Sequence, residues 1–357
     1  LRLTPCKPKS LKMNNTISRT LILLSLTILL IANTSCKKEN TNTQLEIKKV
    51  AMLAGGYTFD DMGFLQSCKD GMEKAKNEFD LEVEYSVDTL TDNFQERIDY
   101  FGDQGFDLVI SIGFMWNDAV INASKKYPKI KFIIVDTELS EPQTNALSIL
   151  FDVDEVAYPL GFLSAWWADK QDSENPKLGY VGAMEIPQIR QFIEPFINGS
   201  LRYNQQYGRN VEAIGNYADS FFSMDLGKHL ADSLINDGAD IIFGVGSVTG
   251  NGALLKATEH EIQGIGVDVD QYYSFPEVSN ILVSSAMKGL DNAIYDVVKS
   301  LIDEGFFSNG LYTGKLENMG VGMAPFHNYE DMIADSIKLE LVNIETGIID
   351  GSILTGW

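Results

Sequence analysis

The sequence predicts an α/β protein built from two doubly wound parallel-sheet lobes. Ten short β-rich runs occur in two series of five, segments of helical periodicity separate them, and many runs end in glycine or aspartate. Strands that alternate with helices of this length form parallel sheets from βαβ units. With 357 residues, of which 45% are hydrophobic, the chain is long and apolar enough for two cores.

The first series of expected strands precedes residue 154 and the second begins at residue 177. The first comprises VAMLAG (50–55), LEVEYSV (81–87), DLVISIG (107–113), KFIIVD (131–136) and LSILFDV (147–153). The second comprises KLGYVGA (177–183), VEAIGNY (211–217), DIIFGVG (240–246), IQGIGVD (262–268) and NILVSS (280–285). Apolar residues at helical spacing predict helices that include 62–79, 187–208 and 225–238.

The N-terminal segment is expected to be a leader rather than part of the fold. Residues 1–12 precede Met13 and are expected to be untranslated. The apolar-rich run at 21–32 follows Arg19 and is too short for a membrane span, as in a signal peptide. The ending Ala-Asn-Thr-Ser-Cys resembles a lipobox, although Asn33 departs from the common pattern. It implies cleavage after residue 35, a lipid on Cys36 and a polar tether over 36–47.

The charge balance argues against nucleic-acid binding. The chain carries a net charge of −22, and residues 1–35 hold five basic residues and no acidic ones. Without them 23 basic and 50 acidic residues remain, a net charge near −27, whereas nucleic acid requires a basic surface. Cleavage and lipidation would leave Cys68 as the one free cysteine, so no disulfide is expected.

The ends of the expected strands are the first place to look for a ligand. Open parallel sheets bind ligands outside the carboxyl ends of their strands, and here these ends carry Gly55, Gly113, Asp136, Gly246 and Asp268. Glycine lets a backbone approach a ligand closely, and a carboxylate accepts hydrogen bonds from hydroxyls or amines. Because both residue types also favour turns, each position alone has a purely structural alternative. For the acids of GIGVDVDQ (264–271), that alternative is a helix N-cap.

Signs of catalysis or of a cofactor are weak. The three histidines do not form a metal-like cluster, and GVGSVTGNG (244–252) lacks the lysine of a phosphate-binding loop. Asp60 and Asp61 precede an expected helix, so they can cap it as easily as contact a ligand. They are also the only candidate for the carboxylate cluster of a nucleoside hydrolase. We therefore expect no enzymatic activity, no cofactor and no metal.

Several motifs along the chain resemble the basic membrane protein family. They are TFDDMGFLQSCKDGM (58–72), SIGFMWNDAV (111–120), KFIIVDT (131–137), LGYVGAMEIPQIRQFIEPFINGS (178–200), DIIFGVGSVTGNG (240–252), GIGVDVDQ (264–271) and SSAMKGLDNAIYDVV (284–298). These proteins are substrate-binding lipoproteins of ABC transporters, including the purine nucleoside receptor A-like proteins. The resemblance implies the type I periplasmic-binding-protein fold with a three-crossover hinge. The lobe ranges that we expect are 48–153 plus 284–318 and 154–283 plus 319–357.

The resemblance also implies a nucleoside in the cleft between the lobes. Phe64 and Phe192 match the two phenylalanines that stack on the base, one from each lobe, and base stacking of this kind contributes about 1–3 kcal/mol per ring. Either ring also has a structural alternative, as a helix residue packed in the core. Asp268 and Lys288 match the residues that hold the ribose hydroxyls, with Asp270 left to fix the turn.

Further positions complete the implied site. Asp136 matches an acid that contacts the base, and Gly246 matches a glycine whose backbone lies against the ligand. Asp60 and Phe114 are additional candidates for ligand contact.

Two departures from the family pattern affect the expected ligand. Leu65 stands where the family usually has asparagine, and Ala54-Gly55 stands where it often has Thr-Asp. Both changes remove polar groups, and hydrogen-bonding sites discriminate strongly against ligands that leave them unpaired. The preferred ligand can therefore differ from guanosine, adenosine or inosine, with Tyr57 and Thr58 as candidate replacements for the lost groups.

Together with the lipobox, the resemblance thus implies a monomeric lipoprotein of the cell envelope that binds nucleosides, with purines preferred, and delivers them to an ABC permease and its ATPase. The expected membrane attachment is the N-terminal lipid alone. One alternative is the same fold with a sugar or a small signalling molecule as ligand. Another is a sensor or surface lipoprotein without a transport partner.

Overall fold

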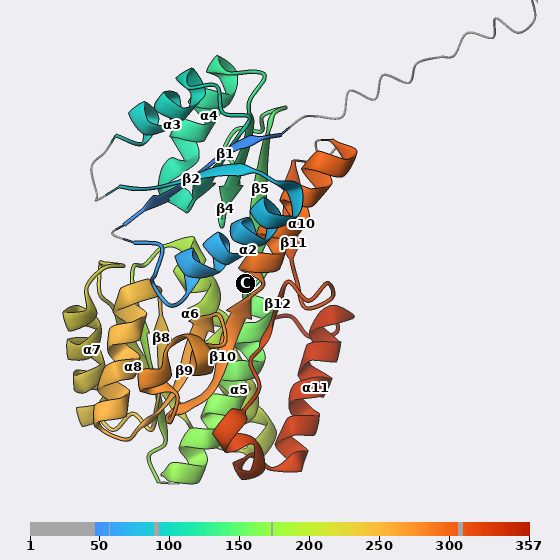
Figure 1. Ribbon diagram of the computed structural model, residues 1–357. Helices are drawn as coiled ribbons and strands as arrows, with labels where there is room; N and C mark the ends of the chain where they lie inside the picture. Colours follow the sequence, from blue (N-terminus) through green and yellow to red (C-terminus); the bar gives the residue numbers. More distant parts are fainter. Residues whose placement is uncertain (1–46, 57, 89–92, 173, 306–309) are drawn as a thin grey trace, which may run out of the picture. The chain divides into compact units, whose positions relative to one another are not determined.

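Two six-stranded sheets, each covered by helices on both faces, form the two lobes of the protein (Figure 1). The computed structural model describes residues 47–357 except 57, 89–92, 173 and 306–309. The leader, Cys36 and almost all of the expected tether lie outside the described residues, and so does Tyr57.

The first lobe contains the sheet β11-β5-β4-β3-β1-β2, in which all strand pairs are parallel. Its strands are β1 (Lys49–Gly55), β2 (Glu82–Asp88), β3 (Leu108–Ile112), β4 (Lys131–Val135), β5 (Ala146–Phe151) and β11 (Leu311–Gly314). Its helices are α2 (Phe64–Phe79), α3 (Phe94–Asp103), η1 (Phe114–Trp116), α4 (Asn117–Lys126) and α10 (Leu290–Glu304).

The second lobe contains the sheet β12-β10-β9-β8-β6-β7, in which only the edge strand β12 runs antiparallel to its neighbour. Its strands are β6 (Lys177–Gly182), β7 (Glu212–Tyr217), β8 (Ile241–Val245), β9 (Gln263–Asp268), β10 (Leu282–Lys288) and β12 (Val321–Met323). Its helices are α5 (Asp154–Gln171), α6 (Pro187–Tyr207), α7 (Met224–Asn236), α8 (Ser247–Glu259), α9 (Gln271–Ser274), η2 (Pro276–Val278), η3 (His327–Met332) and α11 (Asp335–Ile349).

Burial on both sheet faces explains why the strands read as continuous apolar runs. In β1, Val50 and Met52 belong to the core under α2 and α10, whereas Ala51 and Leu53 belong to the core under α3 and α4. Successive side chains of a strand point to opposite faces, so a strand covered on both sides has to be apolar throughout. The second sheet is covered in the same way, by α5 and α6 on one face and α7 and α8 on the other.

The ten expected strands are confirmed, each to within a few residues. The short strands β11 and β12 were not predicted. The expected lobe boundary at 283/284 falls inside β10, because this strand continues to Lys288 in the ladder with β9 and β12. The crossing to the first lobe therefore follows at Gly289.

The chain crosses between the lobes three times, after β5, after β10 and between β11 and β12. Backbone hydrogen bonds hold these crossings together: Asp152 N donates to Gly314 O at 2.8 Å, and Gly289 N donates to Gly320 O at 2.8 Å. A Cβ on Gly320 would lie 2.2 Å from Gly314 Cα, so this close approach requires glycine. In the part of the chain that the structure describes, no helix is long and apolar enough to cross a membrane.

Candidate functional site

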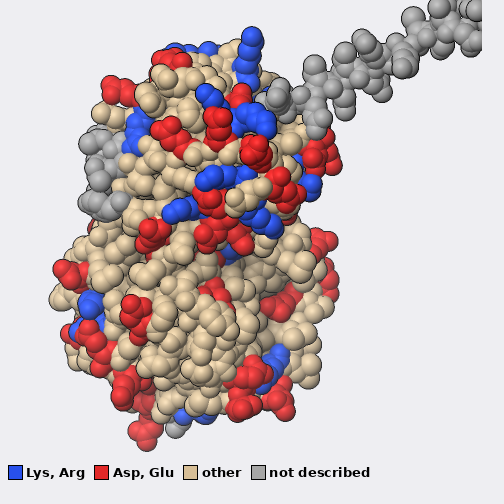
Figure 2. Space-filling view, in the orientation of Figure 1, with Lys and Arg blue, Asp and Glu red and all other residues tan. Residues whose placement is uncertain are grey.

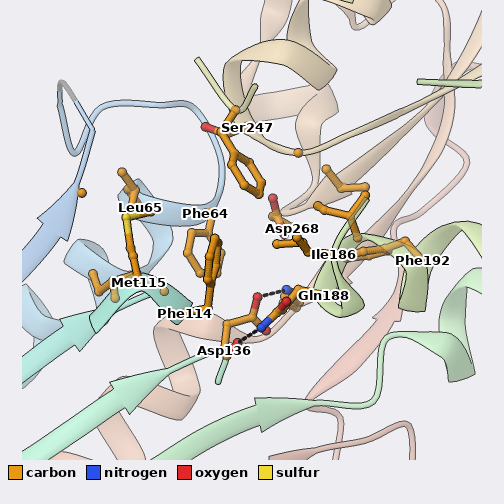
Figure 3. Close-up of a pocket in the computed structure, with 18 of the residues that line it drawn as sticks. Phe64, Leu65, Phe114, Met115, Asp136, Ile186, Gln188, Phe192, Ser247 and Asp268 are labelled. Atoms are coloured by element: carbon orange, nitrogen blue, oxygen red, sulfur yellow. Dashed lines mark hydrogen bonds and ion pairs between the residues drawn. The ribbon is translucent and has the colours of Figure 1, made fainter. Parts of the chain in front are cut away.

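A pocket lies between the carboxyl ends of the strands of the two lobes (Figure 3). It is lined by Gly55, Phe64, Leu65, Ile112, Gly113, Phe114, Met115, Asp136, Ile186, Gln188, Ile189, Phe192, Phe221, Phe222, Gly246, Ser247, Val267, Asp268 and Lys288. Of the eight residues predicted to contact a ligand, seven are in this lining and Asp60 is not.

Asp136 and Asp268 occupy equivalent places in the two lobes. Asp136 directly follows β4, and Asp268 is the last residue of β9. Both have left-handed backbone conformations, with φ of 62° and 70°. Such angles are uncommon for residues other than glycine and occur often at ligand-binding positions.

Asp136 of the first lobe forms an ion pair across the cleft with Lys288 of the second lobe. The Nζ of Lys288, at the end of β10, lies 2.7 Å from Asp136 Oδ2, and the Lys288 side chain is only 4% exposed. Gln188, from the first turn of α6, donates more weakly to the backbone oxygen of Asp136 at 3.4 Å. Figure 3 shows Gln188 beside Asp136. One element of the first lobe, β4, and two of the second, β10 and α6, therefore meet at Asp136.

The carboxylate of Asp268 is buried without a hydrogen-bond partner among the described residues, although it is only 6% exposed. Burial raises the pKa of Asp268 to about 7, since the charged form is disfavoured away from water. Lys288 opposes this shift, whereas the negative charges of Asp136 and Asp61 add to it. A buried acceptor of this kind is stabilised by any ligand that donates hydrogen bonds to it.

Two phenylalanines lie near Lys288 on opposite lobes. Its Nζ lies 5.3 Å from the ring centroid of Phe64 and 5.1 Å from that of Phe192. Phe64 is the first residue of α2 and is partly exposed. Phe192 is 2% exposed and packs edge-on against Phe243 at 6.3 Å, so it belongs to the core as well as to the pocket.

Phe114 and Gly246 also line the pocket. Phe114 lines the pocket and lies 6.5 Å from Phe221 of the other lobe, measured between ring centroids. Gly246 has φ of 107°, and a Cβ there would lie 2.4 Å from the Cβ of Ala183, so only glycine fits against the pocket wall at this position.

The adjacent acids Asp60 and Asp61 have different roles. Asp60 is 75% exposed in its side chain and pairs with Lys69 at 3.3 Å, away from the pocket lining. Asp61 is 4% exposed and accepts from the backbone N–H groups of Leu65 and Gln66 at the start of α2, both at 3.1 Å. Its Oδ2 also accepts from Ser247 of the other lobe at 3.2 Å. Of the two alternatives left open for this pair, the helix cap therefore holds for Asp61.

The two departures from the family pattern share one end of the pocket. A Cβ on Gly55 would lie 2.8 Å from the Sδ of Met115, so Met115 fills the space that a larger residue would take. Leu65 is 7% exposed, and Figure 3 places Leu65 and Met115 on the far side of Phe64 from Asp268. Thr58 is exposed and accepts from Asp60 N at 2.9 Å, and it does not line the pocket.

Sequence reasoning missed several residues of the lining. Met115, Ile186, Gln188, Phe221 and Phe222 follow strands or begin helices at the same edge of each sheet. The signal that could have found Gln188 is its place in the first turn of α6, directly after the strand-end loop of β6. The phenylalanines follow β7, but nothing in their spacing distinguishes pocket residues from core residues.

The site offers aromatic stacking surfaces and hydrogen-bonding side chains. Within the described residues, no group of three or more histidine, cysteine, aspartate or glutamate side chains is placed to hold a metal ion. Aromatic rings from both lobes, a free buried carboxylate and a lysine suit a ligand with a planar group and hydroxyl groups.

Two α/β lobes with three crossings and a pocket in the cleft define the type I periplasmic-binding-protein fold. Residues 47–353 match the family model of PnrA-like ABC transporter substrate-binding proteins, and the chain belongs to this family. Membership implies a ligand and transporter components as partners.

Relatives of known sequence cover most of the chain. Basic membrane protein A of Borreliella burgdorferi is 29% identical over 322 residues, which is 87% of this chain and 88% of that protein. An uncharacterized lipoprotein of Pyrococcus abyssi is 27% identical over 301 residues, 80% of this chain and 72% of that protein.

Solved structures support the fold. An ABC transporter solute-binding protein of Aeropyrum pernix superposes with a TM-score of 0.79 at 23% identity, covering 86% of this chain and 92% of that one. A periplasmic ribose ABC transporter protein of Conexibacter woesei superposes with a TM-score of 0.56 at 13% identity, covering 81% and 95%.

Proposed function

We propose that this protein captures nucleosides, with purine nucleosides preferred, and delivers them to an ABC permease without transforming them chemically. The observation that carries the proposal is the Asp268 carboxylate, which is buried in the pocket and meets no donor among the described residues. A ribose supplies vicinal hydroxyls, and hydrogen bonds to a charged acceptor contribute about 1.5–3 kcal/mol.

The aromatic residues support a planar base next to the sugar. Phe64 comes from the first lobe and Phe192 from the second, and both rings face the pocket near Lys288. A base held between them would link the two lobes, so binding would favour the closed arrangement that a permease recognises.

The test is isothermal titration calorimetry on the chain from Lys37, because residues 47–357 contain the two sheets and their cores. Ligand that co-purifies is removed by unfolding and refolding. The panel contains inosine, guanosine, adenosine, cytidine, uridine, the free bases and ribose. We expect purine nucleosides to bind, with affinity lowered at least about 100-fold by Asp268→Ala and about 10-fold by Phe64→Ala.

Two matched variants control for indirect effects. Phe79→Ala removes a ring at the other end of α2, where it stacks on Tyr295, and Asp60→Asn removes an exposed carboxylate. Both are expected to bind like the wild type. Equal binding of ribose and nucleosides would favour the sugar alternative, and absence of nucleoside binding would refute the proposal.

We also propose that the protein is anchored in the cell envelope by a lipid on Cys36. The similar proteins of Pyrococcus and Borreliella carry the names lipoprotein and basic membrane protein. Acidic side chains are spread over both lobes on the face drawn in Figure 2, so a lipid anchor would hold an otherwise well-hydrated protein at the membrane. Cys36→Ala should shift the protein from the membrane fraction to the aqueous fraction.

Delivery to the permease is tested separately in cells. Cells that carry Asp268→Ala should lose uptake of the nucleoside.

A further inference from the structure

Gln188 is a polar residue of the pocket that neither the sequence nor the comparisons assign to a role. It is the second residue of α6, partly buried, and lines the pocket beside Asp136. Its Nε2 makes one long contact of 3.4 Å to the Asp136 backbone oxygen. Its Oε1 accepts no hydrogen bond from the residues that the structure describes.

The other polar groups of the pocket are mostly engaged. Ser247 donates to Asp61 at 3.2 Å, and Lys288 pairs with Asp136 at 2.7 Å. The carboxylate of Asp268 has no hydrogen-bond partner among the described residues. When ionised it can accept hydrogen bonds but cannot donate them, so it suits hydroxyl donors. Among the described residues of the pocket lining, Gln188 is therefore the side chain that still offers both an N–H donor and a C=O acceptor in one plane.

Among the described residues, the opposite end of the pocket offers no such group. Gly55, Leu65 and Met115 form an apolar wall, and Met115 occupies the space beside Gly55. A base edge turned toward this wall would lose its hydrogen bonds, which costs about 1–3 kcal/mol for each buried polar group left unpaired.

We propose that Gln188 determines which base is bound, by pairing with a base edge that carries a donor next to an acceptor. The ligand class is then purine nucleosides with an oxygen or amino group at position 6, selected over purine riboside, which has only hydrogen there. This inference rests on the proposed function, since it requires a base between the phenylalanines. A side-chain amide recognises the adenine edge in this two-bond manner in protein–DNA complexes.

The position of Gln188 links base recognition to closure of the cleft. It belongs to the second lobe, whereas its contact Asp136 belongs to the first. A base edge bound to the amide at this place would lie against both lobes, so the correct base would stabilise the closed form more than an incorrect one.

The experiment compares inosine, adenosine and purine riboside by calorimetry on the chain from Lys37, refolded free of ligand. The variants are Gln188→Leu and the near-isosteric Gln188→Met, with Gln205→Leu as a control on an exposed position of the same helix. We expect the wild type and Gln205→Leu to bind inosine or adenosine about 10- to 100-fold more tightly than purine riboside. Both Gln188 variants should lose this preference and bind purine riboside as the wild type does.

Two results would overturn the inference while the proposed function stands. One is equal affinity of the wild type for all three nucleosides. The other is a preference that survives in both Gln188 variants. If none of the three nucleosides binds to the wild type, the proposed function fails and this inference fails with it.

Discussion

Asp136 and Asp268 are equivalent in sequence pattern and different in environment. Each stands at the end of the fourth strand of its lobe in chain order, each has a left-handed backbone, and each faces the same pocket. Asp136 is paired with Lys288 at 2.7 Å, whereas Asp268 has no partner among the described residues.

This difference separates a carboxylate that holds the lobes together from one that is available to a ligand. Lys288 comes from the second lobe, so its bond to Asp136 stabilises the closed arrangement. Asp268 belongs to the same lobe as Lys288 and remains unpaired at a cost in stability. A ligand that donates a hydrogen bond to Asp268 would remove that cost. Ligand binding would therefore stabilise the closed arrangement of the lobes.

The largest effect is expected from Lys288→Met. The substitution leaves Asp136 in the pocket without its cation and also removes the positive charge that lowers the pKa of Asp268. Breaking a buried ion pair by removing one partner costs about 3–5 kcal/mol, so we expect a loss of this order in the free energy of unfolding, measured by urea denaturation without ligand.

The matched control for this substitution is Lys299→Met. Lys299 pairs with Asp303 at 2.6 Å on an exposed helix face, where such pairs contribute about 0–1 kcal/mol. Equal stability of the two variants would show that the pair of Lys288 and Asp136 does not hold the lobes together.

A smaller effect is expected from pH and depends on Asp268. Burial raises the pKa of its carboxyl from 3.8 to about 7, so the folded protein binds more protons than the unfolded chain between these values. The contribution of Asp268 to stability therefore falls as pH rises through this window. A ligand that donates hydrogen bonds favours the ionised form, so its affinity should fall by up to about tenfold per pH unit below pH 7.

Calorimetry at several pH values between about 5 and 8 measures this dependence. Asp268→Asn cannot ionise, so its weaker binding should be nearly independent of pH over the same range. A wild-type affinity that stays constant down to about pH 5 would contradict the environment described for Asp268.

The two lobes and ten of their strands were predictable, because burial on both sheet faces forces long apolar runs that helices interrupt. The strands β11 and β12 were not, since four and three residues carry too little pattern. The end of β10 was also misplaced. Ala286 and Met287 pair with both β9 and β12, and Lys288 pairs with β12, a strand that the sequence did not reveal.

A place in the pocket lining was predictable where a strand end and a family motif coincide, as at Asp268. The ion pair between Lys288 and Asp136 was not predictable, because the two residues are 152 positions apart in the chain and meet only across the cleft. The apolar wall was also only partly predictable. The sequence marked Gly55 and Leu65 as departures from the family pattern, but the contact of Met115 with Gly55 is visible only in the fold.

The smallest effect on stability and binding is expected at the exposed Asp60, which we compare with the buried Asp61 next to it. Asp60→Asn should change the free energy of unfolding and the ligand affinity by no more than about 0.5 kcal/mol, since its side chain is 75% exposed.

Asp61→Ala removes the helix cap and the hydrogen bond to Ser247, so a loss of about 1–2 kcal/mol in the free energy of unfolding is expected, measured by urea denaturation. Weaker ligand binding should accompany that loss, because the bond to Ser247 links the lobes. Similar behaviour of the two variants would mean that neighbouring acids in this loop are interchangeable and that burial does not decide their roles.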